Sequence, residues 1–313
     1  MSEYKYLFGP APSRRLGRSL GINIVPSKIC SLDCLYCEVG KTKTTTMLRK
    51  PYYKADDIIN EFKDNFYKFE DLCDVVTVTG AGEPTLNSEL DKIITGIKKY
   101  TSKPCAILTN TTTINIPEVY ESLLKFDIVV PSLDAVNNDV FKAVNLPEKS
   151  INTENIISYL EKFSKDYKGK LFIEILFCKN INDSENHIKE LINVLKNIKY
   201  DKVQLGTIHR PPAYSNTAPV DDEFLLNTAK KFISSGIKAE VTGGFSSVYK
   251  NSATLDLIDL IPALLKMRPC TVHDMCGVFG KDENEILDTI NILTAENKIK
   301  AEYYNNDTYY ITV

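Results

Sequence analysis

The chain has 313 residues, of which 43% are hydrophobic and 25% charged, with a formal net charge of −3. This ordinary globular composition is long enough for one large and one small domain, and the charge indicates no partner class. The first residues contain no apolar signal-peptide core, and no apolar run approaches the roughly 18 residues of a membrane span. We therefore expect a cytoplasmic protein without a membrane partner. Its eight cysteines are then expected as metal ligands, catalytic thiols or core residues, not as disulfides.

Short apolar strands alternate with amphipathic helices over most of the chain. Strands are expected at residues 19–25, 74–80, 105–110, 127–135, 170–178, 201–207 and 237–243. Helices with apolar residues at helical spacing are expected at residues 54–69, 88–100, 116–126, 151–163, 184–198 and 221–236. This alternation predicts an α/β fold with a parallel sheet, as an open sheet or a partial (β/α) barrel.

The pattern changes near residue 250. Helices are expected at 253–267, at 271–280 with Thr271 as the N-cap, and at 282–298, followed by a β-hairpin over 299–313. Three helices and a terminal hairpin are typical of a winged helix. The sequence therefore predicts two domains, residues 1–250 and residues 251–313.

Three cysteines lie within the stretch CSLDCLYCEVG, at Cys30, Cys34 and Cys37. Closely spaced cysteine thiolates on a loop hold iron–sulfur clusters, and three thiolates leave one iron of a [4Fe–4S] cube open to a small molecule. The alternatives are a zinc site or three core thiols. A structural zinc site needs four ligands, and the nearest later cysteine is Cys73, so the spacing favours the cluster.

The cysteine loop, with Tyr36 directly before its third cysteine, resembles the radical S-adenosylmethionine (SAM) superfamily over roughly residues 20–240. The stretch TGAGEPTL, with Gly80, Gly82 and Glu83, resembles the Gly-Gly-Glu-Pro motif that holds the methionine amino group, with Ala81 replacing its first glycine. The resemblance implies that the open iron binds SAM. It also implies that an electron cleaves SAM to methionine and a 5′-deoxyadenosyl radical, which takes hydrogen from a substrate. An external reductant such as flavodoxin or ferredoxin is expected.

Further cofactor residues are expected where strands end, because α/β barrels place their chemistry there. Asn110, Ser132 and Asp134 follow two of these strands, and the resemblance suggests that Tyr36 lies beside the adenine. Glu174 is expected to face the barrel interior and to contact cofactor or substrate. Each residue also has a structural alternative: a turn residue for Asn110, a helix cap for Ser132 and Asp134, a packing aromatic for Tyr36, and a solvated helix seam for Glu174.

Two stretches, FGPAPSRRLGRSLGIN and LGTIHRPPA, resemble a group of iron–sulfur oxidoreductases that is similar to the wyosine synthase of transfer RNA. Wyosine synthases carry a second cluster with cysteines upstream of the radical motif, whereas no cysteine precedes Cys30 here. The substrate-side candidates are Arg14, Arg15, His209 and Arg210. The first pair belongs to a basic front, residues 1–54, with 10 Lys and Arg against 3 acids. The alternative for all four is a structural role or a solvated rim.

The remaining cysteines predict no second cluster. Cys73, Cys105 and Cys178 lie on or beside apolar strands and are expected as core thiols. Cys270 and Cys276 flank His273, and a helix-packed pair is favoured there over a metal site.

Three substrate hypotheses follow. The first is RNA or a nucleotide-like anion, from the basic front and the wyosine resemblance. The second is a protein or peptide docked by the winged helix. The third is a cluster-bearing regulator that reads DNA. It is disfavoured because residues 251–313 carry 10 acids against 5 Lys and Arg, and DNA phosphates repel such an acidic surface.

Overall fold

The computed structural model describes residues 4–13, 15–242 and 257–313 and contains one large curved sheet. Its eight strands, in spatial order, are β1 (Leu7–Ser13), β2 (Gly17–Asn23), β5 (Val75–Thr79), β6 (Cys105–Thr109), β7 (Ile128–Pro131), β8 (Lys170–Phe177), β9 (Lys202–Thr207) and β10 (Ala239–Val241). β2 and the strands after it pair in parallel, whereas β1 pairs antiparallel with β2. The order ends at β1 and β10 without joining them, so the sheet is a partial barrel. The predicted α/β fold class is confirmed.

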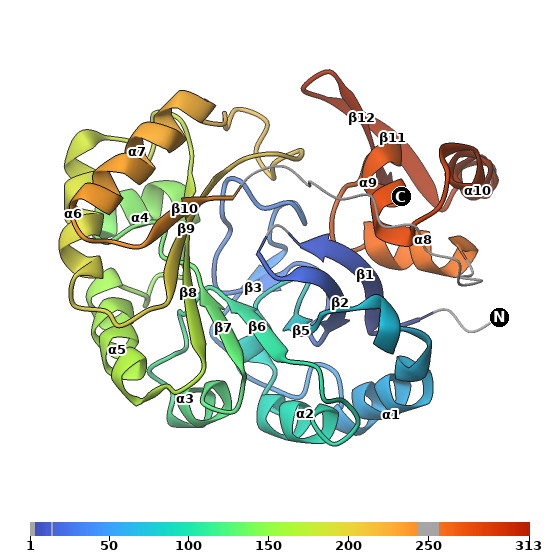
Figure 1. Ribbon diagram of the computed structural model, residues 1–313, viewed down its shortest axis with the longest axis horizontal. Coiled ribbons are helices and arrows are strands. Elements are labelled where there is room, and N and C mark those ends of the chain that lie inside the picture. Colours follow the sequence, from blue (N-terminus) through green and yellow to red (C-terminus); the bar gives the residue numbers. More distant parts are fainter. Residues whose placement is uncertain (1–3, 14, 243–256) are drawn as a thin grey trace.

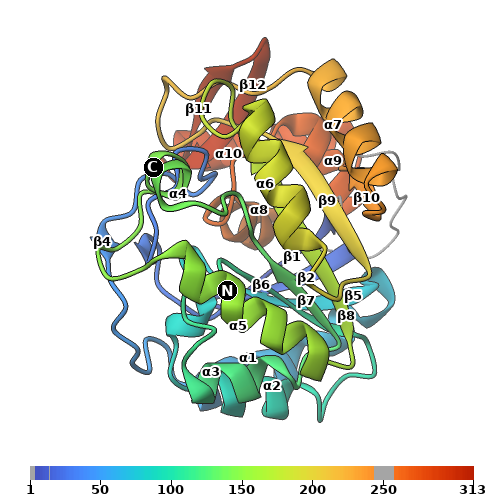
Figure 2. The same ribbon diagram turned by 90° about the vertical axis from the view of Figure 1, so that its left-hand side faces the viewer.

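Helices cover the convex face of the sheet (Figures 1 and 2). They are α1 (Ala55–Asn65), α2 (Leu90–Ile97), α3 (Pro117–Leu123), α4 (Asn138–Asn145), α5 (Thr153–Asp166), α6 (Glu185–Leu195) and α7 (Asp222–Ser234). The later helices begin at polar caps: the side chains of Asn137, Asn152, Ser184 and Asp221 each accept a backbone N–H of the first turn. No helix in the described ranges is long and apolar enough to cross a membrane.

The two faces of the sheet differ in polarity because side chains alternate along each strand. On β2, Leu20 and Ile22 are fully buried in the core beneath the helices, whereas Ser19 and Gly21 line a cavity on the concave side. A side chain at Gly21 would begin 2.0 Å from the ring of Phe8, so glycine is needed where that ring crosses the barrel. On the concave side, polar side chains such as Ser19 and apolar ones such as Phe8 together line a cavity.

The C-terminal part contains α8 (Leu257–Leu265), α9 (Val272–Phe279), α10 (Glu283–Ala295) and a hairpin of β11 (Ile299–Tyr304) and β12 (Asp307–Thr312). Thr271 caps α9 as predicted, in a reciprocal capping box with Asp274. α8 and α9 pack against β1 at the edge of the large sheet (Figure 1). The order of three helices and a hairpin is as predicted. The domain boundary near residue 250 lies outside the described residues and stays a prediction.

Candidate active site at the carboxyl ends of the strands

The cysteine loop starts at β3 (Ile29–Cys30), which pairs with β4 (Thr44–Thr45). Burial raises the pKa of all three thiols, that of Cys30 to about 12, so three thiolates in this place require a cation. Within the described part of the chain, no three His, Cys, Asp or Glu side chains are grouped around a single metal ion. A [4Fe–4S] cube binds its cysteines through separate irons and needs no such grouping.

Nitrogen donors point at two of the sulfurs. Cys30 Sγ accepts the backbone N–H of Leu32 at 3.4 Å and Asn110 Nδ2 at 3.5 Å. Cys34 Sγ accepts Asn145 Nδ2 at 3.3 Å. Hydrogen bonds to cysteine sulfurs are typical of iron–sulfur sites, so the donors around the loop fit the cluster.

The turn after β5 packs directly on the cysteine loop. Lys28 N lies 2.7 Å from the carbonyl oxygen of Ala81, and Glu83 N lies 3.1 Å from that of Ile29. A side chain at Gly82 would begin 1.8 Å from the same Ile29 oxygen. Glycine at this position therefore lets the two backbones meet, and it fixes the turn beside Cys30.

The Glu83 side chain is 2% exposed and lies against two strand ends. Its Oε1 accepts the hydroxyls of Thr85 (2.6 Å) and Thr109 (2.7 Å), and its Oε2 accepts Asn110 N (2.8 Å). Burial raises the pKa of Glu83 although these bonds oppose the shift. The carboxylate therefore ties the β5 turn to the end of β6. Its predicted contact with the cofactor stays a prediction.

Asn110 joins the end of β6 to the cysteine loop. Its Nδ2 donates to Ser31 Oγ at 2.9 Å, and its Oδ1 accepts Thr112 N at 3.1 Å. The second bond is an Asx turn, so the structural alternative for this residue is also present. The next residue, Thr111, has a φ of 62°, which is rare for a β-branched residue. Its hydroxyl donates to the carbonyl oxygen of Ser132 at 3.0 Å and so stabilises this conformation.

The carboxylate of Asp134, just after β7, accepts three hydrogen bonds. Its Oδ2 accepts the hydroxyl of Tyr36 and Nδ2 of Asn145 (2.8 Å), and its Oδ1 accepts the backbone N–H of Leu176 (2.8 Å). Burial raises the pKa of Asp134 to about 6. Tyr36 therefore serves as more than a packing aromatic. The helix-cap alternative for Asp134 and its neighbour Ser132 is wrong, because Asn137 caps α4.

The arginines of the basic front, residues 1–54, lie in different environments. Arg15 lines the concave cavity and forms an ion pair with Glu174, whose contact with cofactor or substrate stays a prediction. Arg18 binds Asp74 at 2.6 Å. Arg14 lies outside the described residues. Of these arginines, Arg15 is thus the one that the described structure brings to the barrel interior.

A cavity of about 240 Å³ lies on the concave side, between β2, β5 and β6. Its polar and charged lining comes from distant parts of the chain, namely Ser13, Arg15, Ser19, Glu38, Thr77, Thr79, Arg210 and Arg268. Gly80 of the β5 turn and Val39 of the cysteine loop line it as well, so the cavity reaches the proposed cofactor residues. Met267 and Arg268, which follow α8, supply a wall from the C-terminal part of the chain.

The two candidates after β9 lie at the contact with the C-terminal part. The carbonyl oxygen of His209 accepts the hydroxyl of Tyr309 at 2.9 Å. Arg210 is 4% exposed, and its Nη1 lies 3.1 Å from Glu38 Oε1. Its Nη2 lies 3.8 Å from Asp274 Oδ1. Arg210 therefore lines the cavity and also links the cysteine loop to α9.

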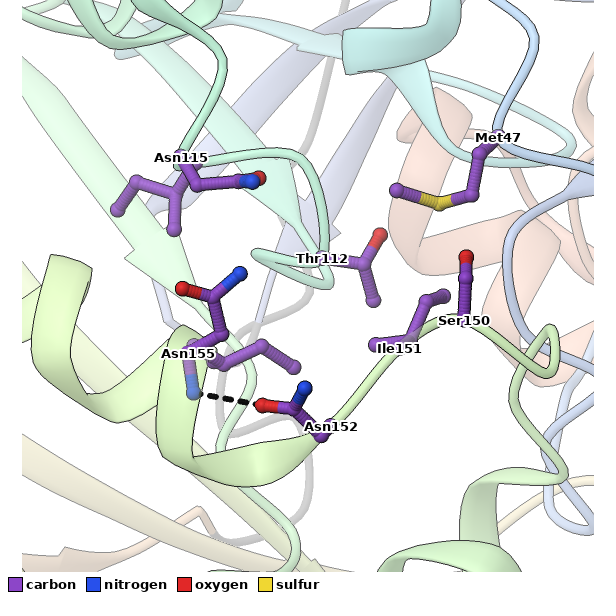
Figure 3. A pocket seen from close by; sticks show the side chains of 9 residues that line it. Met47, Thr112, Asn115, Ser150, Ile151, Asn152 and Asn155 are labelled. Atoms are coloured by element: carbon purple, nitrogen blue, oxygen red, sulfur yellow. Dashed lines mark hydrogen bonds between the residues drawn. The ribbon is translucent and has the colours of Figure 1, made fainter.

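A second, smaller cavity of about 110 Å³ lies beside the cysteine loop (Figure 3). Polar side chains of two loops and a helix start line it, among them Thr112, Asn115, Ser150, Asn152 and Asn155. Asn152 Oδ1 accepts the N–H of Asn155 at 2.9 Å, which caps α5. Thr112 Oγ1 lies 2.6 Å from Ser31 Oγ. Thr112 therefore contacts the cysteine loop, whereas Asn152 stabilises the start of α5.

The sequence did not predict several residues of the site. Glu38 and Asp274 belong to the site because they form ion pairs with Arg210. A buried arginine without such partners would be strongly destabilising. Met267 and Arg268 lie in another part of the chain, and Asn145 lies on α4, which was not predicted. The core assignment of Cys73, Cys105 and Cys178 is confirmed, since all three are 0% exposed. Cys270 is also fully buried, and Cys276 packs against the core.

Comparisons with known proteins agree with this geometry. The family model of the radical SAM superfamily matches residues 24–208. A UPF0026 protein of Methanocaldococcus jannaschii is 30% identical over 310 residues, covering 97% of this chain and 95% of its own length. A UPF0026 protein of Helicobacter pylori is 36% identical over 74% of this chain and 80% of its own length. A GTPase Obg of Brachyspira hyodysenteriae is 34% identical over 96% of this chain, which spans 44% of that protein.

Solved structures show the same fold. A radical SAM methyltransferase from Sphaerobacter thermophilus has a TM-score of 0.56 at 15% identity, covering 71% of this chain and 66% of its own. The structure of TYW1 with a lysine-pyruvate adduct bound has a TM-score of 0.53 at 18% identity, covering 69% and 73%. The chain belongs to the radical SAM superfamily, and it is an iron–sulfur enzyme that uses a [4Fe–4S] cluster and S-adenosylmethionine.

Proposed function

We propose that this radical SAM enzyme takes a hydrogen atom from an anionic substrate, RNA or a nucleotide-like molecule, held on the concave side of the sheet. The observation that carries the proposal is the cavity lined by Arg15, Arg210 and Arg268. Guanidinium groups bind phosphate and carboxylate oxygens in pairs. Each has five N–H donors, so the ion pair of Arg15 with Glu174 does not use all donors of that arginine.

On the cofactor side, we propose that Cys30, Cys34 and Cys37 hold the cluster. The residues proposed to contact SAM are Tyr36, Gly80, Gly82, Glu83, Asn110, Ser132, Asp134 and Glu174. When bound, the cluster and SAM together supply the radical that removes the substrate hydrogen. The chain supplies orientation, because the β5 turn is fixed on the cysteine loop. Flavodoxin or ferredoxin is proposed as the electron donor.

The position of the cavity supports a substrate close to the cofactor. Glu38 and Val39 of the cysteine loop and Gly80 of the β5 turn line it, so a molecule in the cavity would lie next to both. A relative also supports RNA: the dual-specificity RNA methyltransferase RlmN of Buchnera aphidicola is 26% identical over 183 residues, 54% of this chain and 48% of its own length. The wyosine resemblance points the same way.

A second candidate function is the modification of a protein or peptide. We propose that residues 251–313 form a winged-helix domain, and its outer surface carries exposed apolar side chains. Ile292 is 50% exposed, Tyr303 72% and Val313 66%. Such side chains on α10 and the hairpin suit a protein partner.

An untargeted experiment tests these functions. The gene is deleted in its host, and modified nucleosides and the proteome are compared with those of the parent strain by mass spectrometry. The proposal expects a nucleoside or nucleotide that changes in the deletion strain and returns with the intact gene. A change confined to a modified peptide would support the second function, and unchanged nucleosides would contradict the first.

A further inference from the structure

The C-terminal end of α4 is hydrogen-bonded to the cysteine loop through the backbone. The backbone N–H of Leu35 donates to the carbonyl oxygen of Val144 at 3.0 Å, and that of Asp33 donates to the carbonyl oxygen of Asn145 at 3.0 Å. Leu146 then ends the helix with a φ of 43°. These backbone bonds flank Cys34 on both sides, so they fix the position of Asn145 relative to that thiol.

The amide nitrogen of Asn145 donates to two acceptors, whereas its amide oxygen accepts from no donor among the described residues. Its Nδ2 lies 3.3 Å from Cys34 Sγ and 2.8 Å from Asp134 Oδ2. Because the carboxylate of Asp134 accepts, the nitrogen must face it, and this fixes the orientation of the amide. The residue is 2% exposed, yet Oδ1 has no hydrogen-bond partner among the residues that the structure describes. A buried amide oxygen without a donor is costly, so this oxygen is available to accept a hydrogen bond from a bound molecule.

The surroundings of this oxygen indicate what that partner is. Asn145 shares Asp134 with the hydroxyl of Tyr36, and it touches a cluster ligand. SAM carries several donors, namely its ammonium group, two ribose hydroxyls and the adenine amino group. The buried oxygen belongs to the amide whose nitrogen contacts Cys34 and Asp134, so it is suited to accept from one of these donors.

We infer that Asn145 is a positioning residue that connects SAM binding to the cluster. Its Nδ2–H donates to the Cys34 sulfur and raises the reduction potential of the cluster, while its Oδ1 is the acceptor for an N–H or O–H of SAM. The first effect follows because an N–H dipole pointing at a sulfur stabilises the more negative, reduced cluster. The inference rests on the family assignment and is independent of which substrate is modified.

The test compares Asn145→Leu, which removes donor and acceptor but keeps the branching of the side chain at Cγ, with Asn182→Leu as the control. Asn182 is equally buried and bonds the backbone of Asp134, Leu176 and Cys178, but no cysteine of the loop. Both are reconstituted without oxygen. The midpoint potential of the cluster is measured by redox titration with electron paramagnetic resonance, and the Kd of SAM by equilibrium dialysis.

Asn145→Leu is expected to shift the potential to more negative values and to weaken SAM binding about tenfold, the loss of one buried hydrogen bond. The control is expected to match wild type in both. Wild-type potential and Kd in Asn145→Leu with full iron content would overturn the inference. If that variant loses iron, Asn145→Asp, which has no N–H, is measured in the same way and is expected to show the negative shift. Loss of iron in both, with the control intact, would also overturn it, because Asn145 would then only hold the loop.

Discussion

Arg210 holds Glu38 through a two-oxygen ion pair, with Nη1 3.1 Å from Oε1 and 3.2 Å from Oε2. Glu38 directly follows Cys37, a proposed cluster ligand, and Arg210 follows β9. Burial opposes the charge, but Glu38, Cys270 and Asp274 raise the pKa of Arg210 above its usual range. One guanidinium therefore joins the cysteine loop, the barrel and α9.

Replacing this arginine tests the link. Arg210→Met keeps an unbranched apolar stem but removes the guanidinium, which leaves Glu38 and Asp274 without this cation. We expect the free energy of unfolding in urea to fall by about 2 kcal/mol, less than for a fully buried pair because Glu38 is 38% exposed. The matched control is Lys231→Met, which breaks an exposed pair with Glu185 and should leave stability close to that of wild type. Equal effects of the two variants would refute the link.

Glu83 is expected to have two roles that can be measured separately. Glu83→Ala leaves Thr85, Thr109 and Asn110 N without their acceptor, so stability should fall by about 2–3 kcal/mol. If the residue also contacts the ammonium of SAM, the Kd of SAM should rise in cluster-loaded protein kept well below its unfolding temperature. Thr85→Val is the control, since it removes one of these bonds and leaves the carboxylate. A SAM Kd equal to wild type in Glu83→Ala would show that the role is structural alone.

Arg15 is expected to bind an anion in the cavity. Arg15→Gln should weaken the binding of adenosine 5′-monophosphate several-fold at low salt, because one charged donor is lost. Low salt is needed because screening hides such contributions at high ionic strength. Arg18→Gln breaks the pair with Asp74 outside the cavity and should bind the probe as wild type does. Equal binding by both variants would argue against the anion site.

Residues 251–313 should contribute no salt-sensitive affinity for duplex DNA. They carry twice as many acids as Lys and Arg, so they can neutralise few phosphates. Fluorescence anisotropy with a labelled duplex at 50 and 200 mM salt measures this. Tight binding that weakens steeply with salt would restore the DNA-reading hypothesis.

Much of the scaffold follows from periodicity, and the departures have physical causes. The strands of the parallel sheet were predictable because each is a short run rich in apolar and β-branched residues between helical segments. β1 was not predicted, because its sequence LFGPAPS interrupts the strand pattern with glycine and prolines and contains a bulge between Phe8 and Ala11. α4 has eight residues, and its apolar side chains Phe141 and Val144 are too few to give a clear helical period.

The site was predictable only where local spacing carries the chemistry. The cysteine loop and the β5 turn are each short stretches of sequence, so residue types and spacing single them out. Their roles toward the cluster and SAM stay predictions. The partners of those residues come from elsewhere: Asn145 reaches Cys34 from a distance of 111 residues, and Arg210 reaches Glu38 from 172. Such pairs depend on strand order and sheet curvature, which a sequence pattern does not contain.

The cluster itself is the central claim, and one anaerobic assay tests it most directly. The reconstituted protein is analysed for iron, then incubated with dithionite and SAM, and 5′-deoxyadenosine is measured by chromatography. We predict a brown protein with about four irons per chain and slow formation of 5′-deoxyadenosine, both abolished when Cys30, Cys34 and Cys37 are replaced by alanine. About one zinc per chain, no visible absorption and no 5′-deoxyadenosine would contradict the account.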